Sequence, residues 1–252
     1  MKKPFVSRFT PYALCLFIAG CFILSGCHNK KEPVRLAFIS GMHPVFDTAL
    51  YAPVLDDFDG VTWKAYTHEE SQELFKQENK NQYDIIIFYA ICLEELPETT
   101  KQDIIQVVSE GKPVFILHDG LLTYNTWHEF AKIAGMKYFM SEQTVDGVAY
   151  GVSTYKHQQT IPVTVADKDH FITQGMDETF VLHDEIYNGL WQSPGIHVLW
   201  TTTHPDCVRN VMYTYAYGKA KVAGIIMGHG PGIFFDKNFR LAFQRTVRWL
   251  AQ

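Results

Sequence analysis

Three short segments, apolar at nearly every position, limit the folds open to this chain. They span residues 34–40, 83–89 and 113–118, and such runs are typical of strands buried on both faces of a sheet. Helical patterns separate them at residues 47–58 and 97–110. Strands that alternate with helices imply parallel strands joined by crossover helices. The first half of the chain therefore predicts an α/β fold.

The second half has a different pattern. Residues 137–203 contain short strands such as 160–165 and 196–203, with irregular connections between them. A hairpin is predicted at 211–217 and 222–227, and a last helix at 238–250. Because no segment has the composition of a linker, we expect one three-layer α/β domain with β insertions, over residues 34–252.

The N-terminus has the features of an export signal. Residues 1–12 carry three basic side chains and no acid, and residues 13–24 are apolar but too short to span a bilayer. The following Leu24-Ser25-Gly26-Cys27 resembles the bacterial lipoprotein box, in which lipid is attached to the cysteine. We expect a signal peptide at 1–26, lipidation of Cys27 and a polar tether at 27–33. The alternative is an ordinary secretory signal with an incidental cysteine.

These features bear on location and partners. A lipidated Cys27 followed by His28 rather than an acid favours the outer membrane, facing the periplasm, with membrane contact through the lipid anchor only. The formal net charge of -5 excludes the basic surface that a nucleic-acid partner needs. Beyond the signal and Cys27, only Cys92 and Cys207 remain, and we expect structural cysteines rather than a disulfide framework.

Polar side chains follow several of the predicted strands. His118 and Asp119 end the 113–118 strand, His229 follows the 222–227 strand, and His43 follows the first. In open α/β sheets, ligands bind outside the carboxyl ends of the strands. Asp184, Glu185 and Tyr187 form a further polar cluster in the irregular middle section.

Two histidines and a carboxylate can bind zinc or a similar divalent metal, and the same groups can act as general acid and base. The alternative is that each histidine is a hydrogen-bonded structural residue. No H-E-x-x-H or C-x-x-C spacing marks a metal site, and no phosphate-binding glycine motif marks a nucleotide cofactor. We expect the other histidines, such as His157, to lie on the surface or on helix faces.

Aromatic residues flank these segments. Trp127, Tyr187, Trp191 and the Phe234-Phe235 pair stand near the candidate polar residues. Sugar rings pack their C–H faces on aromatic planes while their hydroxyls bond to polar side chains, so this combination suits a carbohydrate pocket. The alternative is that these aromatic rings fill the core.

The order of motifs resembles the trehalose-utilisation, or ThuA-like, family over residues 35–251. The motifs are L-H-D-G at 117–120, W-H-E-F-A-K-I-A-G at 127–135, V-A-D-K-D-H-F-I-T-Q-G at 165–175, H-D-E-I-Y at 183–187, and Y-G-K-A-K-V before M-G-H-G at 227–230. Phe171 replaces the family's usual proline, and Ala220-Lys221 replaces its Gly-Arg.

The resemblance implies a fold similar to class I glutamine amidotransferases: a flavodoxin-like three-layer sandwich with a mostly parallel central sheet. The position of their catalytic cysteine is His118 here, so we expect no glutaminase activity. ThuA-like proteins are associated with uptake and oxidation of disaccharides such as trehalose, often beside a sugar dehydrogenase, which is the protein partner we expect.

We therefore expect an envelope enzyme that acts on a small sugar or keto-sugar as a hydrolase, isomerase or lyase. His118, Glu185 and His229 are the expected catalytic residues, or the ligands of a zinc or manganese ion. The substrate contacts expected are Asp119, Trp127, Asp184 and Tyr187. A non-catalytic sugar-binding lipoprotein is the alternative, and a purely structural interaction protein is a third possibility.

Overall fold

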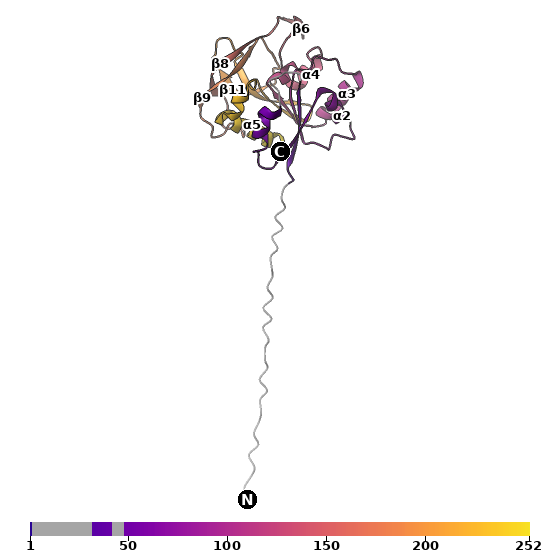
Figure 1. The fold of residues 1–252 in the computed structure, drawn as a ribbon, viewed down its shortest axis with the longest axis vertical. Helices are drawn as coiled ribbons and strands as arrows, with labels where there is room; N and C mark the ends of the chain where they lie inside the picture. Colours follow the sequence, from indigo (N-terminus) through magenta and orange to yellow (C-terminus); the bar gives the residue numbers. More distant parts are fainter. Residues whose placement is uncertain (2–31, 42–47) are drawn as a thin grey trace. The chain divides into compact units, whose positions relative to one another are not determined.

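One half of the central sheet is parallel. In the computed structural model, which describes Met1 and residues 32–41 and 48–252, this half has the order β2-β1-β3-β4-β13 (Figure 1). Its strands are β1 (Val34–Gly41), β2 (Val61–Tyr66), β3 (Ile85–Ala90), β4 (Val114–Leu117) and β13 (Ala220–Ile225). Every neighbouring pair among them runs parallel. The continuous apolar runs therefore form the parallel strands that the sequence predicts.

The other half of the sheet is antiparallel. Among the described residues the sheet has nine strands, and beyond β13 its order is β12-β11-β8-β9. These strands are β12 (Asn210–Tyr217), β11 (His197–Thr202), β8 (Thr154–Val165) and β9 (Thr179–Asn188). The α/β class and the hairpin are confirmed, and the sheet is mixed, because parallel pairing ends at β13.

The middle section is more regular than the sequence suggests. Residues 183–187, predicted to be irregular, lie within the 10-residue strand β9. The strand is hard to recognise because Asp184 and Glu185 are both buried and interrupt the apolar pattern. Two small sheets complete the described strands: β5 (Met136–Lys137) with β10 (Trp191–Gln192), and β6 (Gln143–Val145) with β7 (Val148–Tyr150).

Helices cover both faces of the parallel half. They are α1 (Thr48–Leu55), α2 (His68–Leu74), α3 (Glu98–Ser109), α4 (His128–Ala134) and α5 (Lys237–Leu250). Successive side chains of a strand point to opposite faces, as Phe88 and Tyr89 of β3 show. Phe88 packs against Phe130 of α4, whereas Tyr89 packs against Tyr51 of α1. The molecule is thus a three-layer sandwich.

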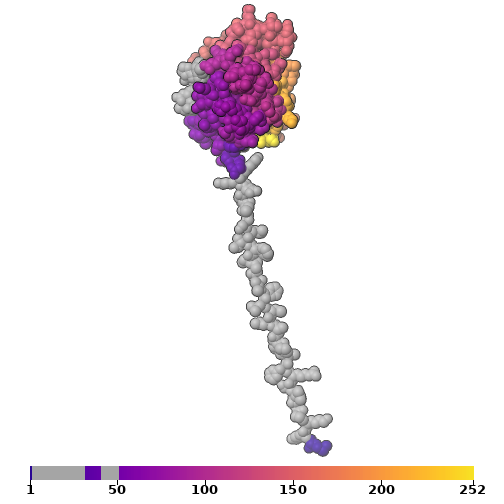
Figure 2. All heavy atoms as spheres, turned by 90° about the vertical axis from the view of Figure 1, so that its right-hand side faces the viewer, coloured from indigo at the N-terminus to yellow at the C-terminus, as the bar shows by residue number. Residues whose placement is uncertain are grey.

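The side that carries α2 and α3 is built by the first half of the chain. Figure 2 shows this side, where residues coloured indigo to magenta make up most of the surface. An ion pair between Lys80, after α2, and Glu110, at the end of α3, joins the two segments at 2.9 Å. Glu185 on β9 and His229, in the loop after β13, belong to the second half of the chain.

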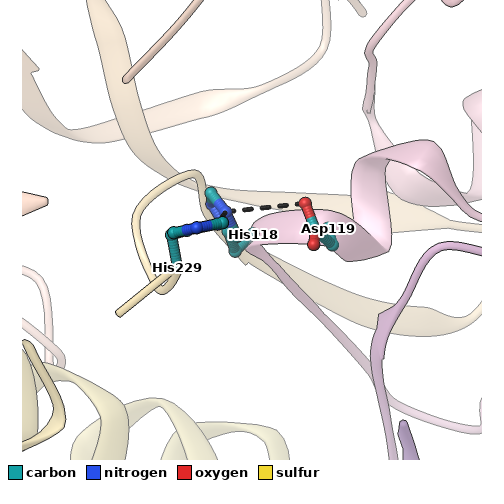
Figure 3. Close-up of side chains that lie close together, drawn as sticks. All are labelled: His118, Asp119 and His229. Atoms are coloured by element: carbon teal, nitrogen blue, oxygen red, sulfur yellow. Dashed lines mark hydrogen bonds and ion pairs between the residues drawn. The ribbon is translucent and has the colours of Figure 1, made fainter. Parts of the chain in front are cut away.

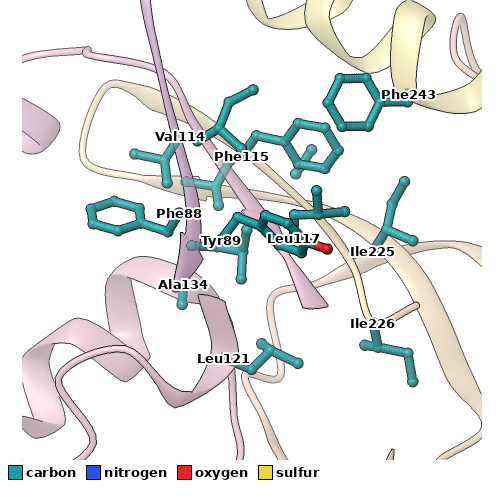
Figure 4. Close-up of a cluster of buried hydrophobic side chains, with 14 of the residues drawn as sticks. Phe88, Tyr89, Val114, Phe115, Leu117, Leu121, Ala134, Ile225, Ile226 and Phe243 are labelled. Carbon is teal, nitrogen blue, oxygen red and sulfur yellow. The ribbon is translucent and has the colours of Figure 1, made fainter. Parts of the chain in front are cut away.

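The core lies where β3, β4 and β13 pass beneath α5. Phe115 of β4 meets Phe243 of α5 with ring centroids 5.0 Å apart, and side chains from β3 and β13 pack around them (Figure 4). Each fully buried side chain of this size contributes about 1.5–3 kcal/mol. The carboxyl ends of β4 and β13 therefore lie at the edge of a well-packed core. This packing fixes the backbone from which the residues after these two strands extend.

In the part of the chain that the structure describes, no helix has the length and apolar character required to span a membrane. The expected signal peptide, Cys27 and His43 lie outside the described residues. Glu32–Gln252 form one compact unit.

Helix α2 begins with a capping box. The Thr67 hydroxyl accepts a hydrogen bond from the Glu70 backbone N–H at 3.2 Å, and the Glu70 carboxylate accepts one from the Thr67 N–H at 2.9 Å. We expect Thr67→Ala to lower the free energy of unfolding by about 1 kcal/mol, because the N-cap acceptor is lost. Thermal melts should show a fall of roughly 2–4 °C. Thr67→Ser retains the acceptor, so an equal loss in that variant would contradict the explanation.

Candidate active site

His118 stands at a sharp turn between β4 and the 3-10 helix η2 (His118–Leu122). Its φ of +45° lies in the left-handed region, which is uncommon for a residue other than glycine. Gly120 makes this turn possible, because a Cβ there would lie 2.2 Å from the Phe88 carbonyl oxygen. Strained backbone of this kind is concentrated at functional sites. The turn fixes the His118 ring at the carboxyl edge of the sheet.

The imidazole of His118 is completely buried, with 0% exposed. Its Nδ1 lies 2.8 Å from the Ile226 carbonyl oxygen and donates to it, because a carbonyl can only accept. Nε2 is the ring nitrogen left to face the site. Nε2 lies 3.3 Å from Nδ1 of His229 and 3.0 Å from the Tyr187 hydroxyl. Figure 3 shows the His118 ring between His229 and Asp119. The fold thus selects both the tautomer and the direction of the free nitrogen.

Tyr187 links His118 to Asp119. Its hydroxyl donates a 2.5 Å hydrogen bond to Oδ1 of Asp119, and its ring stacks on His118 with centroids 4.8 Å apart. Burial, with the neighbouring carboxylate of Asp119, raises the pKa of Tyr187 well above its usual value. Tyr187 is therefore a neutral donor, and it holds the Asp119 carboxylate beside the histidine.

Asp184 fixes the loop that carries His229. Its carboxylate accepts hydrogen bonds from the backbone N–H groups of Gly228, His229 and Gly230, at 2.5, 3.1 and 3.1 Å. Asp184 is buried, so these charge-assisted bonds are shielded from water. The residue orients His229 through its backbone, and it also lines a cavity beside Glu185, so its role as a substrate contact stays a prediction.

Glu185 faces three histidines although only 5% of its side chain is exposed. Its carboxylate lies 3.9 Å from Nε2 of His118 and 3.3 Å from Nδ1 of His229, and it is in ion-pair contact with Nδ1 of His157. Burial raises the pKa of Glu185, whereas the charge of His118 opposes that shift. Burial and His118 both lower the pKa of His229. A basic carboxylate and a neutral imidazole therefore lie side by side.

His157 is a site residue that the sequence does not reveal. It was expected on the surface, and its side chain is 53% exposed, yet it contacts Glu185, and its ring centroid lies 4.8 Å from that of His229. The β8–β9 register shifts between Lys156 and Gln159, and Gln158 has a φ of +53°. This bulge turns His157 toward Glu185. The polar run K-H-Q-Q within a strand is the single sequence signal of the irregularity.

Two cavities meet at these side chains. The larger, of about 640 Å³, is lined by His157, His183, Glu185, His229 and Pro231, among others. The smaller, of about 230 Å³, is lined by Asp119, Tyr138, Met140, Tyr155 and Tyr187, and it shares His157, Glu185 and His229 with the first. The volume of the larger cavity is typical of pockets that bind small molecules.

The aromatic residues at the cavity are in part those expected, because Tyr187 lines the smaller cavity. Trp127 is not among the described residues that line the two cavities; it packs against Tyr124 and Phe130 in the helical layer. Trp127 precedes α4 directly, and α4 directs its apolar side chains toward the sheet. Tyr138 and Tyr155 line the smaller cavity and supply the aromatic rings on which a sugar could pack.

Cysteine chemistry finds no support in the described part of the chain. Cys92 and Cys207 are buried free thiols, and burial raises the pKa of each to about 12. A thiol with such a pKa stays protonated near neutral pH and is a poor nucleophile. The turn after β4 carries His118 instead.

The mixed sheet, the helices on both faces and the turn after β4 define a class I glutamine amidotransferase-like α/β fold. A family model described as "ThuA: Trehalose utilisation" matches residues 48–250, and the chain belongs to this family. No curated protein matches the chain in sequence.

Solved structures share this fold at low sequence identity. A ThuA-like protein from Parabacteroides merdae is 16% identical with a TM-score of 0.72, over 88% of this chain and 91% of that one. One from Bacteroides uniformis is 18% identical with a TM-score of 0.64, over 87% and 92%. A protein from Salmonella typhimurium described as cytoplasmic is 12% identical with a TM-score of 0.62, over 87% and 100%. The likeness is one of fold.

Proposed function

We propose that this protein is an enzyme of carbohydrate metabolism that acts on a small sugar or keto-sugar by acid–base chemistry. One observation carries the proposal: a strained and fully buried histidine, His118, contacts His229 and lies close to the carboxylate of Glu185, and these two residues line the cavity. Ionisable groups with perturbed pKa values in a cavity are typical of active sites. The family's association with trehalose utilisation supports a sugar as the substrate class.

A keto-sugar suits these groups. Its carbonyl acidifies the neighbouring C–H, so a base can remove that proton while the electrons move onto the carbonyl oxygen. Glu185 with its raised pKa, or neutral His229, can take the proton. The former carbonyl oxygen then takes the proton of the hydroxyl on the neighbouring carbon, which becomes the new carbonyl, while the same base returns the first proton to the former carbonyl carbon. These two proton transfers complete an isomerisation without a further reactant. Loss of a leaving group from the same intermediate is an elimination.

The cavity walls offer the contacts that a sugar ring needs. Tyr155 is 56% exposed, and its ring lies 5.1 Å from that of His157, so an open aromatic face stands beside the polar groups. Sugar C–H groups pack on such a face while hydroxyls bond to the carboxylates and imidazoles. This arrangement also favours the second candidate, a sugar-binding protein without turnover.

We further propose that the protein is lipid-anchored at Cys27 in the bacterial envelope, on the outer membrane facing the periplasm. The support is the basic N-terminus, the short apolar run and the Leu24–Cys27 box. A sugar dehydrogenase that oxidises the sugar to its keto form is the partner that would supply the substrate.

The two candidates separate in one comparison. The purified protein is incubated with trehalose, other disaccharides and their keto derivatives, and both binding and product formation are measured. In His118→Asn, the asparagine tolerates the positive φ but removes the imidazole. If the protein is an enzyme, turnover in His118→Asn should fall by roughly 10²–10⁴-fold, while sugar affinity should change much less. Binding without product in the wild-type protein would instead identify the binding protein.

A further inference from the structure

We infer that His157, Glu185 and His229 form a binding site for a divalent transition metal of the zinc type. The inference extends the proposed function, because it concerns the same cavity. It differs from the set of ligands expected from sequence, since His157 takes the place of His118. One atom from each of the three side chains can be chosen so that all lie within 4.8 Å of one another.

The distances suit a small metal ion. Zinc binds nitrogen and oxygen at about 2.0–2.2 Å, which places the ligand atoms of a tetrahedral site about 3.3–3.6 Å apart. Nδ1 of His229 lies 3.3 Å from the Glu185 carboxylate, which is within this range. Nδ1 of His157 is in direct contact with the same carboxylate and would move away from it to admit an ion. His157 is more than half exposed, so its ring is free to adjust around an ion.

The donor types point to the same class of metal. Two imidazole nitrogens and one carboxylate are the ligand set of catalytic zinc sites that leave one position open. Calcium and magnesium prefer sites built from oxygen atoms. The open position here would face the cavity of about 640 Å³, which His157, Glu185 and His229 line together.

A second cluster, formed by His118, Asp119 and His229, also has closely spaced ligand atoms. Its centre is less suited to a metal, because the buried Tyr187 hydroxyl donates to Asp119 and lies 3.0 Å from Nε2 of His118. A cation there would have to displace that hydroxyl. The three residues of the outer cluster line the larger cavity together, so an ion could reach them from it.

The backbone around the outer cluster holds its members in place. Asp184 anchors the loop of His229 through three N–H groups, and the β8 bulge presents His157. Groups that orient metal ligands in this way commonly strengthen binding 10–100-fold. A metal at this position would polarise the carbonyl of a bound keto-sugar, which is the role that the proposed function leaves open.

Zinc binding to the purified protein tests the inference without any substrate. Metal is removed with a chelator, and zinc is then titrated by calorimetry, with metal content measured by mass spectrometry after dialysis. We expect one zinc per chain in the wild-type protein. His157→Ala should weaken binding by about 100-fold or more, because loss of a direct ligand exceeds loss of an orienting group. Manganese and iron(II) are titrated in parallel to identify the preferred metal.

His183→Ala is the matched control. His183 lines the same cavity, but its Nδ1 lies 3.3 Å from the Thr160 hydroxyl and belongs to neither cluster, so its replacement should leave zinc affinity unchanged. If His118→Asn abolishes binding while His157→Ala retains it, the metal occupies the inner cluster and the inference is wrong. Failure of all three metals to bind the wild-type protein also overturns it.

Failure of the metal site and failure of the proposed enzymatic function give different results. Sugar turnover by a protein that binds none of these metals would leave acid–base catalysis in place and remove the metal site. If the protein binds one zinc per chain through His157 but converts no sugar, the metal site is established and the proposed enzymatic function is contradicted.

Discussion

An Asp184→Ala variant is expected to lose about 4 kcal/mol of stability, with a fall in melting temperature of roughly 10 °C. The Asp184 carboxylate accepts the N–H groups of Gly228, His229 and Gly230, and each bond to a charged acceptor is worth about 1.5–3 kcal/mol. Removing the acceptor leaves three donors without their partner. The Gly228 N–H is buried, whereas those of His229 and Gly230 are partly exposed, so water offsets part of the loss. Chemical and thermal unfolding measure the loss directly.

The control is Asp177→Ala. Asp177 is an exposed carboxylate that pairs with Lys237 at 2.9 Å, and loss of an exposed pair costs at most about 1 kcal/mol. Asp184→Asn should fall between the two, because it retains one acceptor oxygen but sets an NH₂ group against backbone donors. A loss below about 1 kcal/mol in Asp184→Ala would show that other contacts hold the loop of His229.

The second large effect concerns turnover rather than stability. Glu185→Gln is expected to reduce kcat/KM for the sugar substrate by roughly 10²–10⁴-fold. Glutamine has nearly the same shape, but it can neither accept a proton nor carry the charge that faces His118, His157 and His229. The loss should appear mainly in kcat, since an interaction with the reacting atoms is removed.

Folding of Glu185→Gln should change little, because the substitution also removes a buried charge whose desolvation is unfavourable. Glu178→Gln serves as the comparison: Glu178 is an exposed partner of Lys168 and should retain full activity. Normal turnover by Glu185→Gln would exclude Glu185 from the reaction. A folded variant with full zinc affinity but no turnover would separate its role as a base from its role as a ligand.

Part of the site could be predicted because it follows directly from strand order. His118 and His229 come immediately after strands that are apolar on both faces, and parallel neighbours bring their carboxyl ends to one edge. Asp119 is next to His118 and shares its position. Predicting these residues required only that the two strands be recognised. In the structure, Nε2 of His118 lies 3.3 Å from Nδ1 of His229.

Other residues of the site could not be predicted, because they come together through contacts between segments that are far apart in the sequence. Glu185 lies on β9, at the opposite edge of the sheet from β2, and it reaches His118 because β8 and β9 extend well beyond their pairing with β11. His157 reaches Glu185 through a bulge. Trp127, by contrast, is close to His118 in sequence but packs into the helical layer.

The sequence by itself determined the parallel half of the sheet, the hairpin and the place of His118 at the end of a buried strand, because these follow from local apolar runs and their order. Only the tertiary structure decided which polar side chains share a cavity. That depends on how far β8 and β9 project, on the bulge at His157 and on the anchoring of His229 by Asp184, all of which are contacts between residues distant in sequence. The periodicity of a sequence indicates which residues of one helix or strand are buried. A binding site depends on how several helices and strands come together in space.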